Sequence, residues 1–155
     1  AHASDSEIDE LWMATARVPW LMAPRDAARL RWQRKSATLP GDGLMLVRNR
    51  AGLSLDGWFE CERTQDTLHI VDYWTRDAVA GPGAPLLNTL VREAKSIGCA
   101  SISVELLAPP MVLKAWYAAG FAERESRPVF VKWTKPSMPT EVLPPIFMTS
   151  ADEDE

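Results

Sequence analysis

The sequence predicts a mixed α/β (α+β) fold, in which an antiparallel meander is followed by a βαβ unit and a terminal strand pair, with helices on both faces of the sheet. Three observations predict it. Three strand-like segments linked by tight turns lie between residues 44 and 74. The stretch Leu68–Gly98 then combines a strand, a glycine loop and an amphipathic helix. A chain of 155 residues with 46% hydrophobic and 25% charged residues suits one soluble globular domain.

Composition excludes several classes of protein. A net charge of -4, part of it from Asp152–Glu155, argues against electrostatic nucleic-acid binding. Cys61 and Cys99 lie in strand-like runs and are expected to be buried thiols, with a disulfide as the alternative, and two histidines give no zinc-ligand spacing. No apolar run could span a bilayer, and Leu11–Ala23 differs from a signal peptide, so we expect a cytoplasmic protein. The start at Ala1 predicts a fragment, a processed product or a tag remnant.

Two short helices are predicted near the N-terminus. Ser4 and Asp5 are candidate caps for a helix over Ile8–Val18, which Pro19 ends. The second runs from Pro24 to about residue 35, and we expect its basic face to be solvated.

The three strands of the meander are expected at Leu44–Asn49, Leu53–Glu62 and Leu68–Trp74. Turns at residues 50–52 and 64–66 link them. Residues 78–85 read AVAGPGAP and lead into a helix that Gly98 ends. Backbone N–H groups and the helix dipole make such a loop suitable for a phosphate, and a plain connecting turn is the alternative.

The second half of the chain continues the alternation. A strand is predicted at Ala100–Leu106, parallel to Leu68–Trp74, and a helix from Pro109 to Ala119. Ala122–Arg127 and Val129–Trp133 are expected to form the final strand pair.

The domain is expected to cover residues 1–135, followed by a proline-rich, acidic tail over 136–155. We expect this tail to add little to the core, because its prolines interrupt regular structure. Docking on the domain through its apolar residues stays open for Leu143, Ile146, Phe147 and Met148.

From Leu44 to Lys135 this order of elements resembles the GNAT superfamily of acyl-CoA-dependent N-acyltransferases. Gly81 and Gly83 match the glycines of the family's loop, although Ala78 stands where the family has glutamine or arginine. Gly120 and the phenylalanine after it match the family's Leu-Tyr-x-x-x-Gly-Phe helix ending, with Trp116 at the usual tyrosine position and Tyr117 one place on.

One departure from the family concerns its first strand, for which there is no room ahead of Ile8. The outer strand of the meander would then be open for pairing with a second copy of the chain or with a preceding GNAT-like domain.

The resemblance implies acetyl-CoA as cosubstrate, no metal, and a small-molecule or peptide amine as acceptor. Acetyl-CoA would lie against the end of the strand Leu68–Trp74, and its pantetheine arm would enter where this strand parts from Ala100–Leu106. The implied cofactor-binding residues are Tyr73, Trp74, Thr75, Ala80, Gly81, Pro82, Gly83, Ala84 and Trp116.

The resemblance also calls for a base and an acid, since a neutral amine attacks the thioester and a thiolate leaves. Asp72 and Glu60 are the candidate bases, and a solvent-facing strand position is the alternative for Asp72. Tyr117 is the candidate acid, or else a core or interface aromatic. The indole of Trp116 either bonds the sulfur or only packs. Cys61 has no paired histidine that would make it a nucleophile.

Two functions follow from these observations. The first is transfer of an acetyl group from acetyl-CoA to an amine. The second is a non-catalytic GNAT-fold module that serves as a structural or partner-binding half of a larger protein. Gly81 and Gly83 favour the first, whereas Ala78, Trp116 and the missing strand favour the second.

Overall fold

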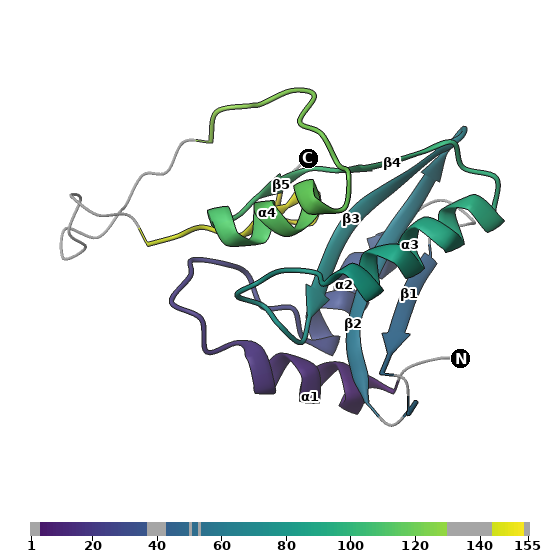
Figure 1. The fold of residues 1–155 in the computed structure, drawn as a ribbon. Coiled ribbons are helices and arrows are strands. Elements are labelled where there is room, and N and C mark those ends of the chain that lie inside the picture. Colours follow the sequence, from purple (N-terminus) through teal and green to yellow (C-terminus); the bar gives the residue numbers. More distant parts are fainter. Residues whose placement is uncertain (1–3, 37–42, 50, 53, 130–143, 154–155) are drawn as a thin grey trace.

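A four-stranded mixed sheet forms the centre of the protein. The computed structural model describes residues 4–36, 43–49, 51–52, 54–129 and 144–153. The sheet has the order β1–β2–β3–β4 (Figure 1). Its antiparallel part is β1 (Gly43–Arg48), β2 (Leu55–Thr64) and β3 (Thr67–Thr75), and β4 (Ser101–Val104) pairs with β3 in parallel. The predicted mixed class, with a meander followed by a parallel pair, is confirmed.

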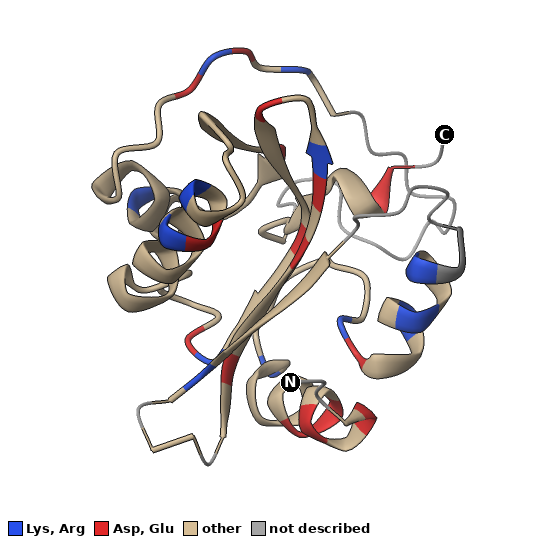
Figure 2. Ribbon diagram, turned by 90° about the vertical axis from the view of Figure 1, so that its right-hand side faces the viewer, with Lys and Arg blue, Asp and Glu red and all other residues tan. Residues whose placement is uncertain are grey.

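Helices lie on both sides of this sheet, as Figure 2 shows with the strands between them. One side carries α1 (Asp5–Thr15) and α2 (Ala27–Ser36), and α1 contacts both β2 and β3. The other side carries α3 (Ala84–Ser96) and α4 (Pro110–Ala118). None of the helices in the described part of the chain has the length and apolar character needed to span a lipid bilayer.

The first helix begins at the predicted cap and is tied to the edge of the sheet. Ser4 and Glu7 form a capping box, in which the Glu7 carboxylate accepts the backbone N–H of Ser4 at 3.0 Å. The same carboxylate pairs with Arg48 of β1, whose Nη2 donates at 3.0 Å. Together these contacts, that of Arg48 first, lower the pKa of Glu7 from 4.5 to about 2.

Glu7→Gln is expected to remove a pH-dependent part of the stability. Because the pKa of Glu7 is depressed in the folded state, its contribution is full above pH 4.5 and disappears as the pH falls toward 2. The variant should therefore melt below the wild type at neutral pH and match it in strong acid. Thermal melts across this range test the prediction, with the exposed Glu10→Gln as control. Equal melting temperatures at neutral pH would contradict it.

The buried core joins both helical layers to the central strands. On the α1 side, Trp12 packs against Trp74 at 5.2 Å between ring centroids, and the Trp74 indole donates to Thr15 Oγ1 at 2.7 Å. On the α3 side, Leu87 and Leu90 are buried. Both cysteines are buried and free, as predicted.

The predicted strand Ala100–Leu106 is interrupted in the structure. After β4, the two-residue strand β5 (Leu106–Leu107) belongs to a separate small sheet, in which it pairs antiparallel with β6 (Met148–Thr149). A short 3₁₀ turn, η1 (Ser150–Asp152), follows β6.

The prediction of a strand over Ala122–Arg127 is wrong, since these residues have no regular structure. Their side chains are exposed, and consecutive charged residues give a strand no apolar face to bury. Val129 is the last described residue before the gap, so nearly all of the second predicted strand, Val129–Trp133, lies outside the described residues.

The expectation that the C-terminal segment adds little to the core is also wrong for residues 144–153. The side chain of Phe147 is 1% exposed and lies among Trp20, Tyr73 and Trp74. Backbone hydrogen bonds join Leu21 to this segment, one to Pro145 O and one from Phe147 N. The segment is thus part of the same packed unit as β3.

The outer edge of β1 has no partner strand in the described part of the chain, because the sheet begins there. Pairing of this edge with a second copy or with a preceding domain stays a prediction.

Candidate functional site

A β-bulge marks the middle of β3. Ile70 pairs with Cys61 and Asp72 with Glu60, so Val71 is the extra residue on β3. The parallel pairing with β4 ends at the same place, since Ile70 opposite Val104 is its last pair. Beyond it, β3 continues to Thr75 without β4, while the chain after β4 turns into the second small sheet. The bulge therefore lies where β3 and β4 part, and bulges are common beside active sites.

The glycine loop follows directly from this part of β3 and leads into α3. Gly81 has a φ of +81°, which glycine adopts readily, and a Cβ there would lie 3.1 Å from the backbone of Val112 in α4. Gly83 is the N-cap of α3 and is exposed together with Ala84. The first-turn N–H groups of a helix have no intrahelical acceptors, so this end of α3 can attract an anion.

Other features of the loop work against anion binding. Pro82 and Pro85 have no N–H, and the Ala80 N–H donates to the Asp77 carboxylate at 3.0 Å. A pocket of about 480 Å³ opens beside the loop and contains two carboxylates and one guanidinium. Arg76 supplies that guanidinium, and its Nη2 already donates a hydrogen bond to Leu55 O at 2.6 Å. The residues that line the pocket are Asp56, Thr75, Arg76, Asp77, Gly81, Gly83 and Leu86.

Asp72 is buried, so the alternative of a solvent-facing strand residue is wrong. Its Oδ1 accepts hydrogen bonds from Arg25 Nε at 3.3 Å, Thr149 Oγ1 at 2.8 Å and the Tyr73 N–H at 2.9 Å. Burial raises the pKa of Asp72, and the charge of Arg25 opposes this rise. In this structure the carboxylate is engaged by three donors.

Arg25 is the centre of an ionic network that joins three distant segments. Its side chain is fully buried and ion-paired with both Asp72 and Asp152. Nη1 donates to Ala23 O at 2.8 Å, Nη2 lies 3.4 Å from Thr149 Oγ1, and the guanidinium lies 4.9 Å from the ring centroid of Phe147. Arg25 thereby connects the segment before α2, the strand β3 and the C-terminal residues.

Glu60, the second candidate base, is buried on β2 directly opposite Asp72. The two predicted bases are thus register partners on neighbouring strands. Cys61, the next residue, is a poor nucleophile, because burial and the nearby Glu60 raise the pKa of its thiol to about 12.

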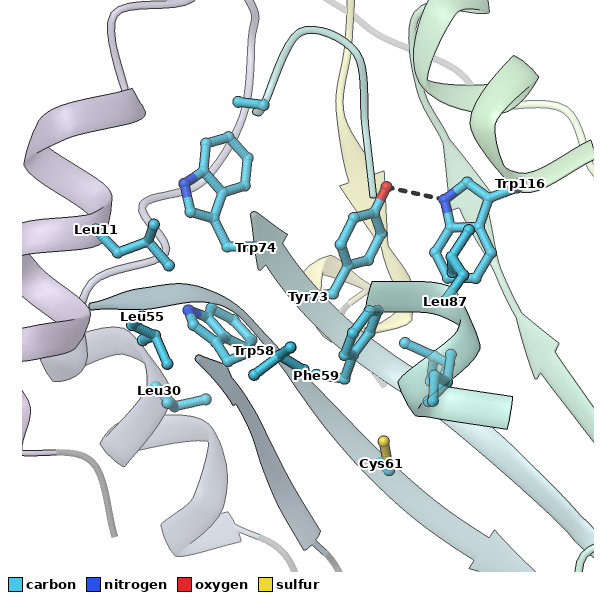
Figure 3. Close-up of a cluster of buried hydrophobic side chains, with 14 of the residues drawn as sticks. Leu11, Leu30, Leu55, Trp58, Phe59, Cys61, Tyr73, Trp74, Leu87 and Trp116 are labelled. Atoms are coloured by element: carbon cyan, nitrogen blue, oxygen red, sulfur yellow. Dashed lines mark hydrogen bonds between the residues drawn. The ribbon is translucent and has the colours of Figure 1, made fainter. Parts of the chain in front are cut away.

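Tyr73 and Trp116 form the other part of the site, in the aromatic cluster of Figure 3. The Trp116 indole N–H donates to the Tyr73 hydroxyl at 3.2 Å, and the two rings meet edge to face with centroids 5.3 Å apart. Both side chains are buried, and burial raises the pKa of Tyr73. Trp116 therefore packs in the core and donates a hydrogen bond, and the acceptor of this bond is the Tyr73 hydroxyl.

Tyr117, the candidate acid, lies outside this cluster. Its side chain is 49% exposed, and its hydroxyl donates to Glu123 at 3.4 Å on the surface. The expectation of a core aromatic at this position is wrong, and the structure does not bring Tyr117 near Asp72 or Tyr73.

The C-terminal segment covers the part of β3 that β4 leaves. The Ser150 hydroxyl donates to Val71 O, the carbonyl of the bulge residue, at 3.2 Å. Both β6 and η1 contact β3, and β6 pairs with β5 on its other side. In Figure 1 this segment is yellow and lies beside β5, behind α4.

Sequence reasoning missed Arg25, Thr149 and Asp152 as site residues. An apolar run at residues 146–148 pointed to docking of the tail, but nothing local linked Asp152 to Arg25, 127 positions away. Among the described residues, no group of three or more His, Cys, Asp or Glu side chains could hold a metal ion.

Comparison with known proteins shows the fold alone. No protein-family model and no curated protein matches the sequence. The chain is similar to the crystal structure of a point mutant of TTHA1254 from Thermus thermophilus, with a TM-score of 0.51 and 17% sequence identity. The match covers 86% of this chain and 96% of that chain.

Proposed function

We propose that the protein is an acyl-CoA-dependent N-acyltransferase that transfers an acetyl group from acetyl-CoA to an amine. The observation that carries the proposal is the coincidence of three features on β3. The strand bulges at Val71, parts from β4 at the same point, and continues into a glycine loop that starts a helix. The pyrophosphate would bind at Gly83 and Ala84, and the pantetheine arm would follow β3 beyond the bulge.

The phenol of Tyr73 is the best placed acid in this proposal and replaces Tyr117. Its oxygen accepts the Trp116 N–H, so its own proton stays available for another acceptor. The phenol is protonated at neutral pH, as an acid for a leaving thiolate must be, and the hydrogen bond from Trp116 acts against the rise in its pKa that burial causes. The Trp116 N–H would also stabilise the phenolate that forms.

Asp72 and Glu60, which pair in the register of β2 and β3, remain the proposed bases. A buried carboxyl whose pKa is raised accepts a proton more readily than an exposed one, which supports Asp72. The amine acceptor would deliver its proton through water, because both carboxyls are buried.

Gly83→Asp is expected to lower the affinity for acetyl-CoA at least tenfold without loss of stability. The glycine has a φ of -64° and ordinary space for a Cβ, with the nearest atom 3.7 Å away in Pro85, so an aspartate fits. Aspartate at an N-cap stabilises a helix, and its charge would repel the pyrophosphate. Calorimetric titration with acetyl-CoA, together with thermal melts, measures both effects.

The matched control is Gly83→Asn, which has the same shape and capping ability but no charge. It should bind acetyl-CoA more tightly than Gly83→Asp at similar stability. Equal affinities of the wild type and both variants for acetyl-CoA would rule out the phosphate-loop proposal and leave the loop as a connecting turn.

A second candidate function, a non-catalytic module, is favoured by one specific observation. The C-terminal segment fills the opening between β3 and β5 and engages Asp72. If this arrangement is permanent, acyl-CoA cannot reach the bulge, and the module would serve a partner instead.

A further inference from the structure

The C-terminal segment Phe147–Asp152 lies on β3. Three of its side chains act on the site of the proposed reaction. Ser150 bonds the carbonyl of Val71, Thr149 donates to Asp72, and the ring of Phe147 packs against Tyr73 at 5.5 Å. The backbone of the bulge, the candidate base and the candidate acid are therefore all in contact with one segment.

This segment is held by few interactions of its own backbone. β6 has only two residues, and η1 is a single turn of three. Side chains supply most of its polar attachments: Asp152 forms an ion pair with Arg25, with Arg29 Nη2 3.5 Å from the other carboxylate oxygen, and Arg29 and Gln33 donate to Ala151 O at 2.9 and 3.3 Å. An element with short secondary structure that is held mainly by side-chain contacts is suited to local opening.

We propose that Phe147–Asp152 is an autoinhibitory plug, latched by the Asp152–Arg25 ion pair, that must leave β3 before acyl-CoA binds. The inference rests on the proposed acyl-CoA function and adds its regulation. With the plug in place, Asp72 Oδ1 accepts a hydrogen bond from Thr149. The carbonyl of Val71, at the edge of β3, accepts one from Ser150. When the plug leaves, Asp72 loses one of its three donors and the carbonyl of Val71 is freed, while Arg25 keeps Asp72 as its counter-charge.

The latch suggests what would release it. Asp152 competes with any other anion for Arg25 and Arg29, whose side chains lie together around one carboxylate. A free energy of only a few kilocalories per mole between closed and open forms is enough to lower an apparent affinity a hundredfold. Acyl-CoA would bind the open form only, so its binding and plug release are coupled.

The test compares acetyl-CoA binding by the wild type, Asp152→Asn and Ser150→Ala. Asp152→Asn removes the charge of the latch and leaves Arg25 paired with Asp72, and Ser150→Ala removes only the bond to Val71 O. Both variants are expected to bind acetyl-CoA tighter, Asp152→Asn by about tenfold, as for a rise of the open fraction from about 1% to 10%. Glu153→Gln is the control, because Glu153 is 49% exposed and pairs with the exposed Arg127.

Hydrogen exchange provides the second measurement. On addition of acetyl-CoA to the wild type, the amides of Phe147 and Thr149, which donate to Leu21 O and Asp152, should exchange faster. Slower exchange of these amides, or weaker binding by the variants, would show that the segment completes the site and would overturn the plug. Equal affinities of all forms would overturn the plug and leave the proposed function standing. Absence of binding by every form would overturn the proposed function and the plug with it.

Discussion

Arg25→Ala is expected to lower the free energy of unfolding by about 3–5 kcal/mol, the cost of breaking a buried ion pair from one side. Arg25 is 1% exposed, and its removal leaves the buried Asp72 without a counter-charge and Asp152 with Arg29 alone. It also leaves Ala23 O without its donor and removes the cation above the ring of Phe147. Urea unfolding at neutral pH measures the loss.

The same variant should recover part of its stability in mild acid. Burial already raises the pKa of Asp72, and loss of Arg25 removes the largest opposing effect, which leaves only the hydrogen bonds from Thr149 and the Tyr73 N–H to lower it. A carboxyl whose folded pKa is raised takes up protons on folding, so its unfavourable contribution is absent below its ordinary pKa of 3.8, grows as the pH rises from there and is complete above the raised folded pKa.

Arg31→Ala is the matched control, because its partner Asp5 and Arg31 itself are 52% and 60% exposed. An exposed pair of this kind contributes about 1 kcal/mol or less. A similar small loss for Arg25→Ala would show that the network does not hold the C-terminal segment.

Phe147→Ala is the second large effect, with an expected loss of about 3–5 kcal/mol in the free energy of unfolding. The ring is 1% exposed, and it lies 5.9 Å from Trp20, 5.5 Å from Tyr73 and 5.6 Å from Trp74 between centroids. Truncation leaves a cavity among three large aromatic side chains that cannot collapse without moving β3. Chemical denaturation, read by tryptophan fluorescence, measures the change.

Tyr117→Ala serves as the comparison for this prediction, since it truncates an aromatic side chain that is 49% exposed. Its loss should stay within about 0.5 kcal/mol, as for ordinary surface substitutions. If Phe147→Ala cost no more than this, the C-terminal segment would be a loosely attached tail, as its sequence first indicated.

Local pattern was enough to predict most of the fold. The meander follows from apolar residues at strand spacing, Ser4 was a correct cap, and Gly98 ends α3 with a φ of +78°. Each of these features depends on residues close in sequence. The strand predicted at Ala122–Arg127 does not form, because its consecutive charged residues leave a strand no apolar face to bury.

The candidate site was predictable only in part. Asp72, Glu60, Tyr73 and Trp116 were named from the sequence, and the structure brings them into two connected groups. The bulge at Val71 was not predictable, because the residues around it also fit a regular strand. The contact between Arg25 and Asp152 joins residues 127 positions apart, and the spacing of residues within one element cannot predict such a pair.

The burial of Phe147 and Asp152 also has a consequence for synthesis of the chain. Ribosomes deliver β3 and Arg25 long before the residues that complete their surroundings, so the nascent domain carries an exposed aromatic surface and lacks the carboxylate of Asp152 that pairs with Arg25 and Arg29. Contacts of such large sequence separation also slow the search for the native arrangement. Folding is therefore expected to finish only after residue 152 has left the ribosome tunnel, and until then the partly folded chain is a natural client for chaperones.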